Sequence, residues 1–208
     1  MMVITSKSLQ RSNIAFVFKQ EGFITPENGD FAILYTGELA KGANFIDDPV
    51  MRLKVYHLPK LKMTFTLEGT RFRVDHDTEI GHLNPAIVSE SLSAYRNLFS
   101  KCNLESFGFN FDIIYRFDST LQLDYLFGLI ADNEILEKND LTAFGIQFTL
   151  RRPDKSETYF LKIVSPLELA AHVNYHFNSN QLMDEQKMKE LLPKSYEETD
   201  EIIKNLKF

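Results

Sequence analysis

The sequence predicts an α+β protein with a large antiparallel sheet and helices packed on one face of it. Two segments, 107–117 and 166–178, alternate apolar and polar residues almost without interruption. A period of two is typical of a strand with one buried and one solvated face. Other segments repeat apolar residues at spacings of three and four, as amphipathic helices do. We therefore expect about seven to nine strands, with helices on the face that carries the phenylalanines.

Length and composition fit one folded domain. The chain has 208 residues, enough for a sizeable core, and we expect a single domain over 1–208. Because the order strands, helix, strands occurs twice, two halves at 1–117 and 118–208 remain an alternative. There are 18 phenylalanines and no tryptophan. Many of the phenylalanines fall at alternate positions, which indicates a sheet core. The alternative is a phenylalanine-lined cavity for an apolar ligand.

The first sixty residues contain short patterns that predict three strands and a loop. Residues 13–19 alternate and predict a strand. We interpret the apolar run at 31–36 as a second strand. Segment 37–49 is rich in turn residues and predicts a loop. Alternation resumes at 51–57 and predicts a third strand.

The next segments predict a hairpin and then a helix. Apolar residues alternate over 60–67, and their parity changes across 68–70. Such a change is typical of a tight turn, here leading into a strand at 71–74. Residues 84–85, Asn-Pro, offer an N-cap and a first helical residue. The apolar spacing over 88–99 then predicts a helix of about four turns.

Segment 107–117 is the strand that we expect at the centre of the sheet. One face carries six large apolar side chains: Phe107, Phe109, Phe111, Ile113, Tyr115 and Phe117. At ~25 cal/mol per Å², their burial contributes on the order of 10 kcal/mol before entropy is counted. We therefore expect Phe111→Ala to destabilise the fold strongly, and Asn110→Ala, on the other face, to cost little.

The second half of the chain continues with a helix and further strands. Residues 118–133 predict a capped helix. Segments 144–150 and 158–164 alternate on either side of a turn at 152–156, which predicts a hairpin. The start of 166–178 could also form a helical capping box. A strand explains every position of that segment, and we favour it.

From residue 184 onward the apolar period is helical. Apolar residues recur every three or four positions up to residue 206, and Pro193 interrupts them. The pattern predicts two helices, or one helix that is kinked at Pro193.

Charge limits the class of partner. The net charge of −6 argues against nucleic acid and against an anionic membrane. Six basic residues nevertheless lie between positions 49 and 74: Arg52, Lys54, Lys60, Lys62, Arg71 and Arg73. They predict either a solvated sheet face or a basic strip for an acidic partner, whose binding would weaken with salt.

Cysteine usage and the absence of long apolar stretches indicate in which cellular compartment to expect the protein. The single cysteine, Cys102, excludes an intramolecular disulfide and a multi-cysteine metal site, and we interpret it as a structural thiol. The N-terminal residues contain no apolar run of signal-peptide length. The sequence has no stretch of about eighteen apolar residues, so it predicts no membrane span. We expect a soluble cytoplasmic protein.

Candidate ligand-binding residues come from the polar faces of the two long strands. They are Asn110, Asp112 and Arg116 on the first, and His172, Asn174 and His176 on the second. On each strand these side chains point the same way because they occupy alternate positions. An acid, an arginine and imidazole groups could orient a polar ligand.

The histidines raise the question of a metal. Alternate residues on a strand are about 7 Å apart, too far for His172 and His176 to chelate one ion unaided. A site would need His76 or His82 from the loop 75–82. We expect no metal and no cofactor, although a metal-assisted hydrolase or lyase remains an alternative.

No motif of a familiar enzyme class is present. The sequence contains no G-x-G-x-x-G, P-loop, G-x-S-x-G or H-E-x-x-H. We therefore assign no catalytic residue. The observations favour a non-catalytic protein-binding module or complex subunit. The alternatives are the metal-assisted enzyme and a binder of an apolar small molecule.

Overall fold

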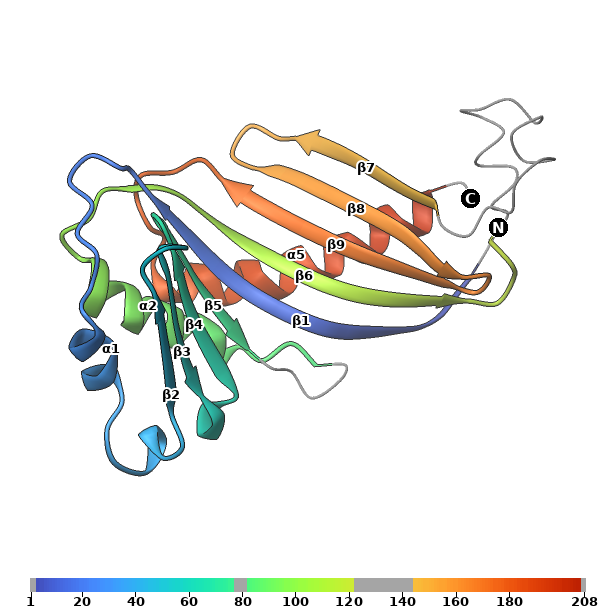
Figure 1. Cartoon of the computed structure of the whole chain (residues 1–208). Helices are drawn as coiled ribbons and strands as arrows, with labels where there is room; N and C mark the ends of the chain where they lie inside the picture. The colour runs from blue at the N-terminus through green and yellow to red at the C-terminus, as the bar shows by residue number, and fades with distance from the viewer. Residues whose placement is uncertain (1–2, 77–81, 122–143, 207–208) are drawn as a thin grey trace.

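The computed structural model describes residues 3–76, 82–121 and 144–206 (Figure 1). Within these residues the chain forms one sheet of nine strands in the order β2-β3-β4-β5-β1-β6-β9-β8-β7. Every pair of neighbouring strands is antiparallel. Three helices pack against this sheet. The predicted fold class is confirmed.

The elements have the following bounds. The strands are β1 (Ile4–Phe18), β2 (Asn44–Asp48), β3 (Leu53–Leu58), β4 (Met63–Glu68), β5 (Arg71–His76), β6 (Leu104–Phe117), β7 (Phe144–Arg151), β8 (Ser156–Ser165) and β9 (Glu168–Phe177). The helices are α1 (Asn28–Leu34), α2 (Ala86–Phe99) and α5 (Glu185–Asn205). Two short 3-10 segments, η1 (Gly37–Ala40) and η2 (Pro59–Leu61), lie in connections. None of the helices in the described part of the chain is long and apolar enough to cross a membrane.

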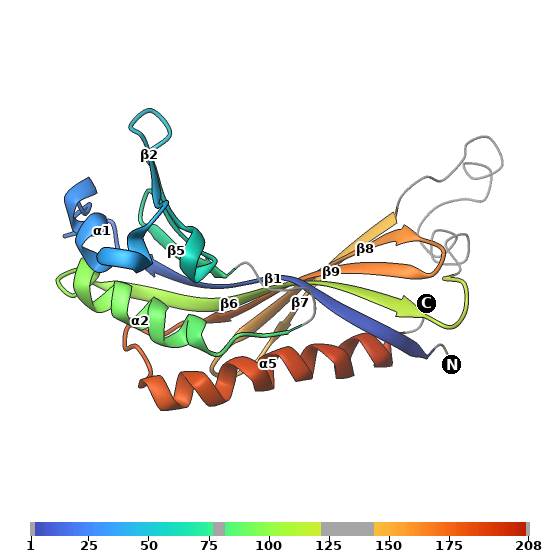
Figure 2. The ribbon, with the colours of Figure 1, turned by 90° about the horizontal axis from the view of Figure 1, so that it is seen from below.

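The helices α2 and α5 lie on the same side of the twisted sheet (Figure 2). We call this side the covered face. The opposite side, the open face, carries no helix among the described residues. The distinction follows from the alternation of the strands, which puts apolar side chains on one side and polar side chains on the other.

Strand β6 lies near the middle of the sheet, between β1 and β9, as expected. Its phenylalanines are buried on the covered face, and Phe111 is 0% exposed. Phe107 is paired in register with Phe177 of β9, and their ring centroids are 4.9 Å apart. The strand prediction for 166–178 is also confirmed, since β9 buries every second residue from Leu169 to Phe177.

The apolar stripes of both long helices pack on the covered face. In α2 the stripe includes Val88, Leu92 and Phe99, all fully buried. Asn84 Oδ1 accepts a hydrogen bond of 2.9 Å from the backbone N–H of Ala86, the first residue of α2, although the N-cap position itself is Pro85 and not the predicted Asn84.

The C-terminal helix is one continuous element. Asp184 caps it through a hydrogen bond of 2.8 Å from the backbone N–H of Lys187. Met188, Leu192 and Ile203 are buried beneath it. Pro193 lies inside α5, so the single-helix alternative is correct. The proline removes one backbone donor, but the buried stripe continues on both sides of it.

Two short segments differ from the prediction. The strand predicted at 31–36 is wrong, because Asn28–Leu34 forms α1. The backbone N–H of Glu27 donates to Asp30 Oδ2 at 2.7 Å in a capping box, a signal that outweighs a brief apolar run. The loop predicted at 37–49 contains the edge strand β2, whose Asp47 and Asp48 mask its alternation.

Two further predictions concern segment lengths. The strand predicted at 13–19 begins much earlier, at Ile4. Its first half includes several exposed polar side chains and therefore lacks the apolar alternation. The helix predicted at 118–133 falls mostly on residues outside the described part of the chain.

Candidate functional site

The open face of β6 and β9 carries all six predicted ligand-binding residues, and two pairs of them lie side by side. The two strands are adjacent, and their register pairs Asn110 with Asn174 and Asp112 with His172. Arg116 is opposite Glu168, and His176 is opposite Gly108. Residues predicted separately on two strands therefore share one face, but Arg116 and His176 lie near opposite ends of it, since Arg116 is eight residues along β6 from the partner of His176. Sequence periodicity could assign their faces but not this pairing.

Three asparagines form a hydrogen-bonded ladder across the middle of this face. Asn110 Nδ2 donates to Asn13 Oδ1 on β1 at 2.7 Å. On the other side, Asn174 Nδ2 donates to Asn110 Oδ1. Asn110 is only 3% exposed and Asn13 6%, although no helix from the described residues covers them. Buried amides need such partners, so the ladder fixes the side chains of three neighbouring strands.

A buried carboxylate continues the row on β5. Asp75 is 2% exposed and lies opposite Asn13 in register. Arg11 Nη2 is 2.7 Å from Asp75 Oδ1, and Arg73 Nε is 2.7 Å from Asp75 Oδ2. Two guanidinium groups on one carboxylate leave this cluster with a net positive charge. Sequence reasoning missed the cluster, although the alternate positions of Arg73 and Asp75 place both on one face.

The histidine and the aspartate at the next register position form an exposed pair. His172 Nδ1 is 2.6 Å from Asp112 Oδ1, and their side chains are 51% and 40% exposed. His176 Nε2 is instead 2.8 Å from Asn178 Oδ1. Arg116 Nε and Glu168 Oε1 form another exposed pair at 2.7 Å. Exposed pairs of this kind contribute little to stability, so they are available for contacts with a ligand.

The histidines do not converge on one point. His76 is opposite Ser12 and Met63 in register, and this row lies on the covered face. Its Nε2 is 2.9 Å from Asn84 Nδ2. Residues 77–81 of the predicted metal loop lie outside the described residues. Within the described ranges, no group of three or more His, Cys, Asp or Glu side chains could hold an ion.

An apolar part of the open face was not predicted. Phe160 and Val164 of β8 are 45% and 47% exposed. Phe160 is opposite His172, and on the neighbouring strands Ala170 is opposite Ile114. We call Ile114, Phe160, Val164 and Ala170 the apolar patch; Lys162 lies within it, between Phe160 and Val164 on β8 and opposite Ala170. Its only signal in the sequence is that Phe160 and Val164 occupy polar-face positions in the alternation of 158–164.

The six predicted basic residues fall in three places, with two of them in each. Lys54 Nζ is 2.9 Å from Asp47 Oδ2, and Arg73 pairs with Asp75. Arg71 lies on the open face opposite Glu68. Lys60 and Lys62 lie at η2, and Arg52 lies in the turn between β2 and β3. The structure does not bring them together as one strip.

The phenylalanines fill the core, and the cysteine is packed beside it. Phe18 and Phe99 have ring centroids 4.8 Å apart, and Phe72 and Phe99 4.7 Å. Cys102 is buried, with its Sγ 3.7 Å from the carbonyl oxygen of Ile24. This position is compatible with a structural thiol.

Comparisons with known proteins give no family. No protein-family model matches the sequence, and no curated protein shows significant similarity to it.

Proposed function

We propose that this protein is a non-catalytic binding module that holds a partner protein against the open face of its sheet. The observation that carries the proposal is the apolar patch beside the His172–Asp112 pair. Phe160 is half exposed, and its neighbours on the open face are polar, among them His172 and Gln147, so it has the composition of an aromatic anchor within a polar rim.

The asparagine ladder supports the same proposal. It fixes three strands beneath the surface, so the open face is already ordered before any partner arrives. A preformed surface loses less conformational entropy on binding than a flexible one. The exposed charge pairs also lose less conformational entropy on binding, because Arg116 and His172 already contact their acidic neighbours.

Charge favours a partner with an apolar anchor and an acidic rim. Lys162 of β8 is exposed, and within the described residues no acidic side chain pairs with it. The Arg11–Asp75–Arg73 cluster adds a second positive charge in a chain whose net charge is −6. Carboxylates on the partner would be attracted to this surface, mainly raising the association rate.

The surroundings of His172 do not favour catalysis. A histidine held by an aspartate can act as a base, but covalent catalysis also needs a nucleophile within hydrogen-bond reach. The residues opposite His172 on the adjacent strands are Asp112 and Phe160. Of these two, only Asp112 has a nucleophilic group, and its carboxylate is already hydrogen-bonded to the His172 imidazole.

Photo-cross-linking in the native host cell tests the proposal. A photoreactive phenylalanine analogue replaces Phe160 in one variant. In the control variant it replaces Ile33, which is 73% exposed on α1. We expect a discrete cross-linked protein at position 160 and not at position 33, and excess wild-type protein should suppress it.

Two results would contradict the proposal. One is the same set of products at both positions, which indicates random collisions. The other is an adduct only with a second copy of this chain, which would make the open face a dimer interface.

A further inference from the structure

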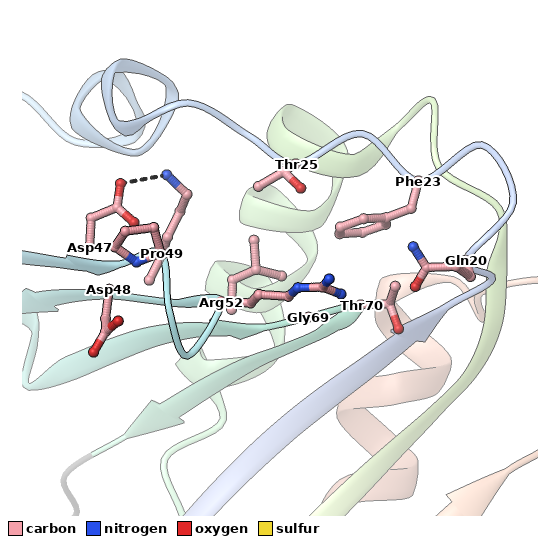
Figure 3. A pocket seen from close by; sticks show the side chains of 11 residues that line it. Gln20, Phe23, Thr25, Asp47, Asp48, Pro49, Arg52, Gly69 and Thr70 are labelled. Carbon is pink, nitrogen blue, oxygen red and sulfur yellow. Dashed lines mark hydrogen bonds and ion pairs between the residues drawn. The ribbon is translucent and has the colours of Figure 1, made fainter.

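A cavity of about 520 Å³ lies away from the open face, at the end of the sheet near α1. It is bounded by the turn between β2 and β3, the turn between β4 and β5, and the segment joining β1 to α1 (Figure 3). Leu67, which lines it, is buried on the covered face. The cavity is therefore independent of the surface proposed for a partner protein. Its volume is in the range of small-molecule sites.

The carboxylates of this cavity are engaged locally. Asp47 forms an ion pair of 2.9 Å with Lys54, and that hydrogen bond holds the pKa of the Asp47 carboxyl below its usual value. Asp48 Oδ1 accepts hydrogen bonds from the backbone N–H groups of Val50 and Met51 at 3.0 and 3.1 Å. The Asp48 side chain points away from Arg52 (Figure 3).

Of the two cations that line this cavity, Lys54 is paired with Asp47, and Arg52 is left without an acidic partner from the described part of the chain. In Figure 3 its guanidinium group extends along the cavity toward Thr70 and Gln20. A guanidinium fork is well suited to a carboxylate or a phosphate because it can donate two parallel hydrogen bonds.

The backbone of Arg52 is in a conformation that favours glycine. Its φ is +51°, in the left-handed region, and its carbonyl oxygen accepts a hydrogen bond of 3.0 Å from the N–H of Gly69. Gly69, in the facing turn, has a φ of +57°. One turn therefore has glycine in this conformation and the other has arginine. Arginine at a positive φ is less stable than glycine would be at the same position. A functional role for the Arg52 side chain would explain why arginine is present.

The other walls of the cavity add donors and an apolar surface. The Gln20 amide and the Thr25 and Thr70 hydroxyls line it. The ring of Phe23 faces the same space (Figure 3). A single free guanidinium beside an aromatic wall matches a monoanion with an apolar body better than a doubly charged phosphate.

We propose that this cavity binds a small organic carboxylate, with its carboxylate on Arg52 and its apolar part against Phe23. The protein-binding proposal does not depend on this site. Each can therefore fail without the other.

The test compares two probes of the same size and shape, the anion 3-phenylpropanoate and the neutral 3-phenylpropanamide. Both are titrated into the full chain at constant ionic strength and followed by two-dimensional amide NMR. We expect saturable shifts at Phe23, Gly69 and Thr70 with the carboxylate. The amide should bind at least about tenfold more weakly, because it has no negative charge and only one acceptor oxygen, so it cannot form the bidentate ion pair with the guanidinium.

Arg52→Gly is the decisive variant. Glycine suits the positive φ, so we expect an unchanged or higher melting temperature. Affinity for 3-phenylpropanoate should fall to that of the amide. Arg52→Gln keeps a side chain at this position but removes its charge. Its affinity for 3-phenylpropanoate should fall to the same extent. Arg71→Gln is the matched control, because Arg71 is an exposed arginine on the open face, and it should bind like wild type.

Three results would overturn the proposal. One is no saturable shift with millimolar 3-phenylpropanoate. Another is equal affinity for the carboxylate and the amide, or for wild type and Arg52→Gly. The third is saturable binding of inorganic phosphate that exceeds binding of the carboxylate, which would assign the site to another class of anion.

Discussion

The two faces of the central sheet differ in what holds them in place. On the covered face, Phe111 is buried among rings and beneath α5, with the ring centroid of Tyr196 5.4 Å away. On the open face, the next residue of the same strand, Asn110, is almost as buried, but only neighbouring amides hold it. Burial alone therefore does not separate structural from functional residues here. The open face is ordered by hydrogen bonds and still has no helix over it among the described residues.

This difference suggests a division of roles. Apolar burial on the covered face provides the larger part of the folding free energy. The open face then needs to be stable enough to keep its shape and is free to contact a partner. Substitutions on the two faces should therefore have different consequences for stability and for binding.

Replacement of Phe111 by alanine should have the largest effect. The side chain is 0% exposed, and its removal leaves a cavity between β6 and α5. We expect a loss of ~3–5 kcal/mol in the free energy of unfolding, measured by urea denaturation. An unchanged denaturation midpoint would contradict the assignment of faces.

Asn110→Ala should have an intermediate effect, larger than the sequence suggested. The expectation of a small cost treated the polar face as solvated. In the structure the substitution removes the donor to Asn13 and the acceptor for Asn174. Leaving buried amides unpaired costs about 1–3 kcal/mol.

A double-mutant cycle with Asn13→Ala measures the coupling within the ladder. The two substitutions together should cost less than the sum of the single ones, because the same hydrogen bond is lost in each. Strict additivity would mean that the ladder does not act as a unit.

The covered face should make the fold sensitive to alkaline pH. Burial raises the pKa of Tyr196 to about 12. An unfolded tyrosine loses its proton near pH ~10, so above that pH the folded state binds more protons than the unfolded state. The free energy of unfolding should therefore fall as pH rises from about 10 to 12, by up to about 1.4 kcal/mol per pH unit for this group.

Tyr196→Phe isolates this contribution. The hydroxyl of Tyr196 has no hydrogen-bond partner among the described residues, so the variant should be close to wild type in stability at neutral pH. It should lose less stability than wild type between pH 10 and 12, as measured by denaturation at each pH. Parallel pH profiles would show that Tyr196 is not protected from ionisation.

The histidines of the open face should have the smallest effect on the fold. His172 is half exposed, and its pair with Asp112 is a surface interaction. We expect the double variant His172→Ala, His176→Ala to melt within a few degrees of wild type. Elemental analysis of the purified protein should find no stoichiometric transition metal. About one equivalent of zinc or iron, lost in the double variant, would instead favour the metal-assisted enzyme.

The sequence predicted the long elements well and the short ones less well. Segments 107–117 and 166–178 are long enough for their period to be unambiguous, and each forms a strand whose covered face is fully apolar. Segment 31–36 is too short to distinguish a strand from the helix α1. Periodicity also assigned the six candidate residues to polar faces, but it contains no information on which strands are neighbours.

Other features depend on tertiary structure and have no local signal. The burial of Asn110 depends on the side chains of β1 and β9, which are far from it in sequence. The φ of Arg52 depends on how the turn between β2 and β3 meets Gly69. Such properties could not be predicted from composition or spacing.

The measurement that most directly tests the division between the faces is a paired assay of Phe160→Thr. Threonine suits a strand, and Phe160 is 45% exposed, so the free energy of unfolding should change by no more than about 1 kcal/mol. Binding of the partner identified by cross-linking should weaken by at least about thirtyfold, as for an aromatic anchor at an interface. That result would place stability and binding on opposite faces of one sheet. A variant that unfolds, or one that binds the partner as wild type does, would contradict the account.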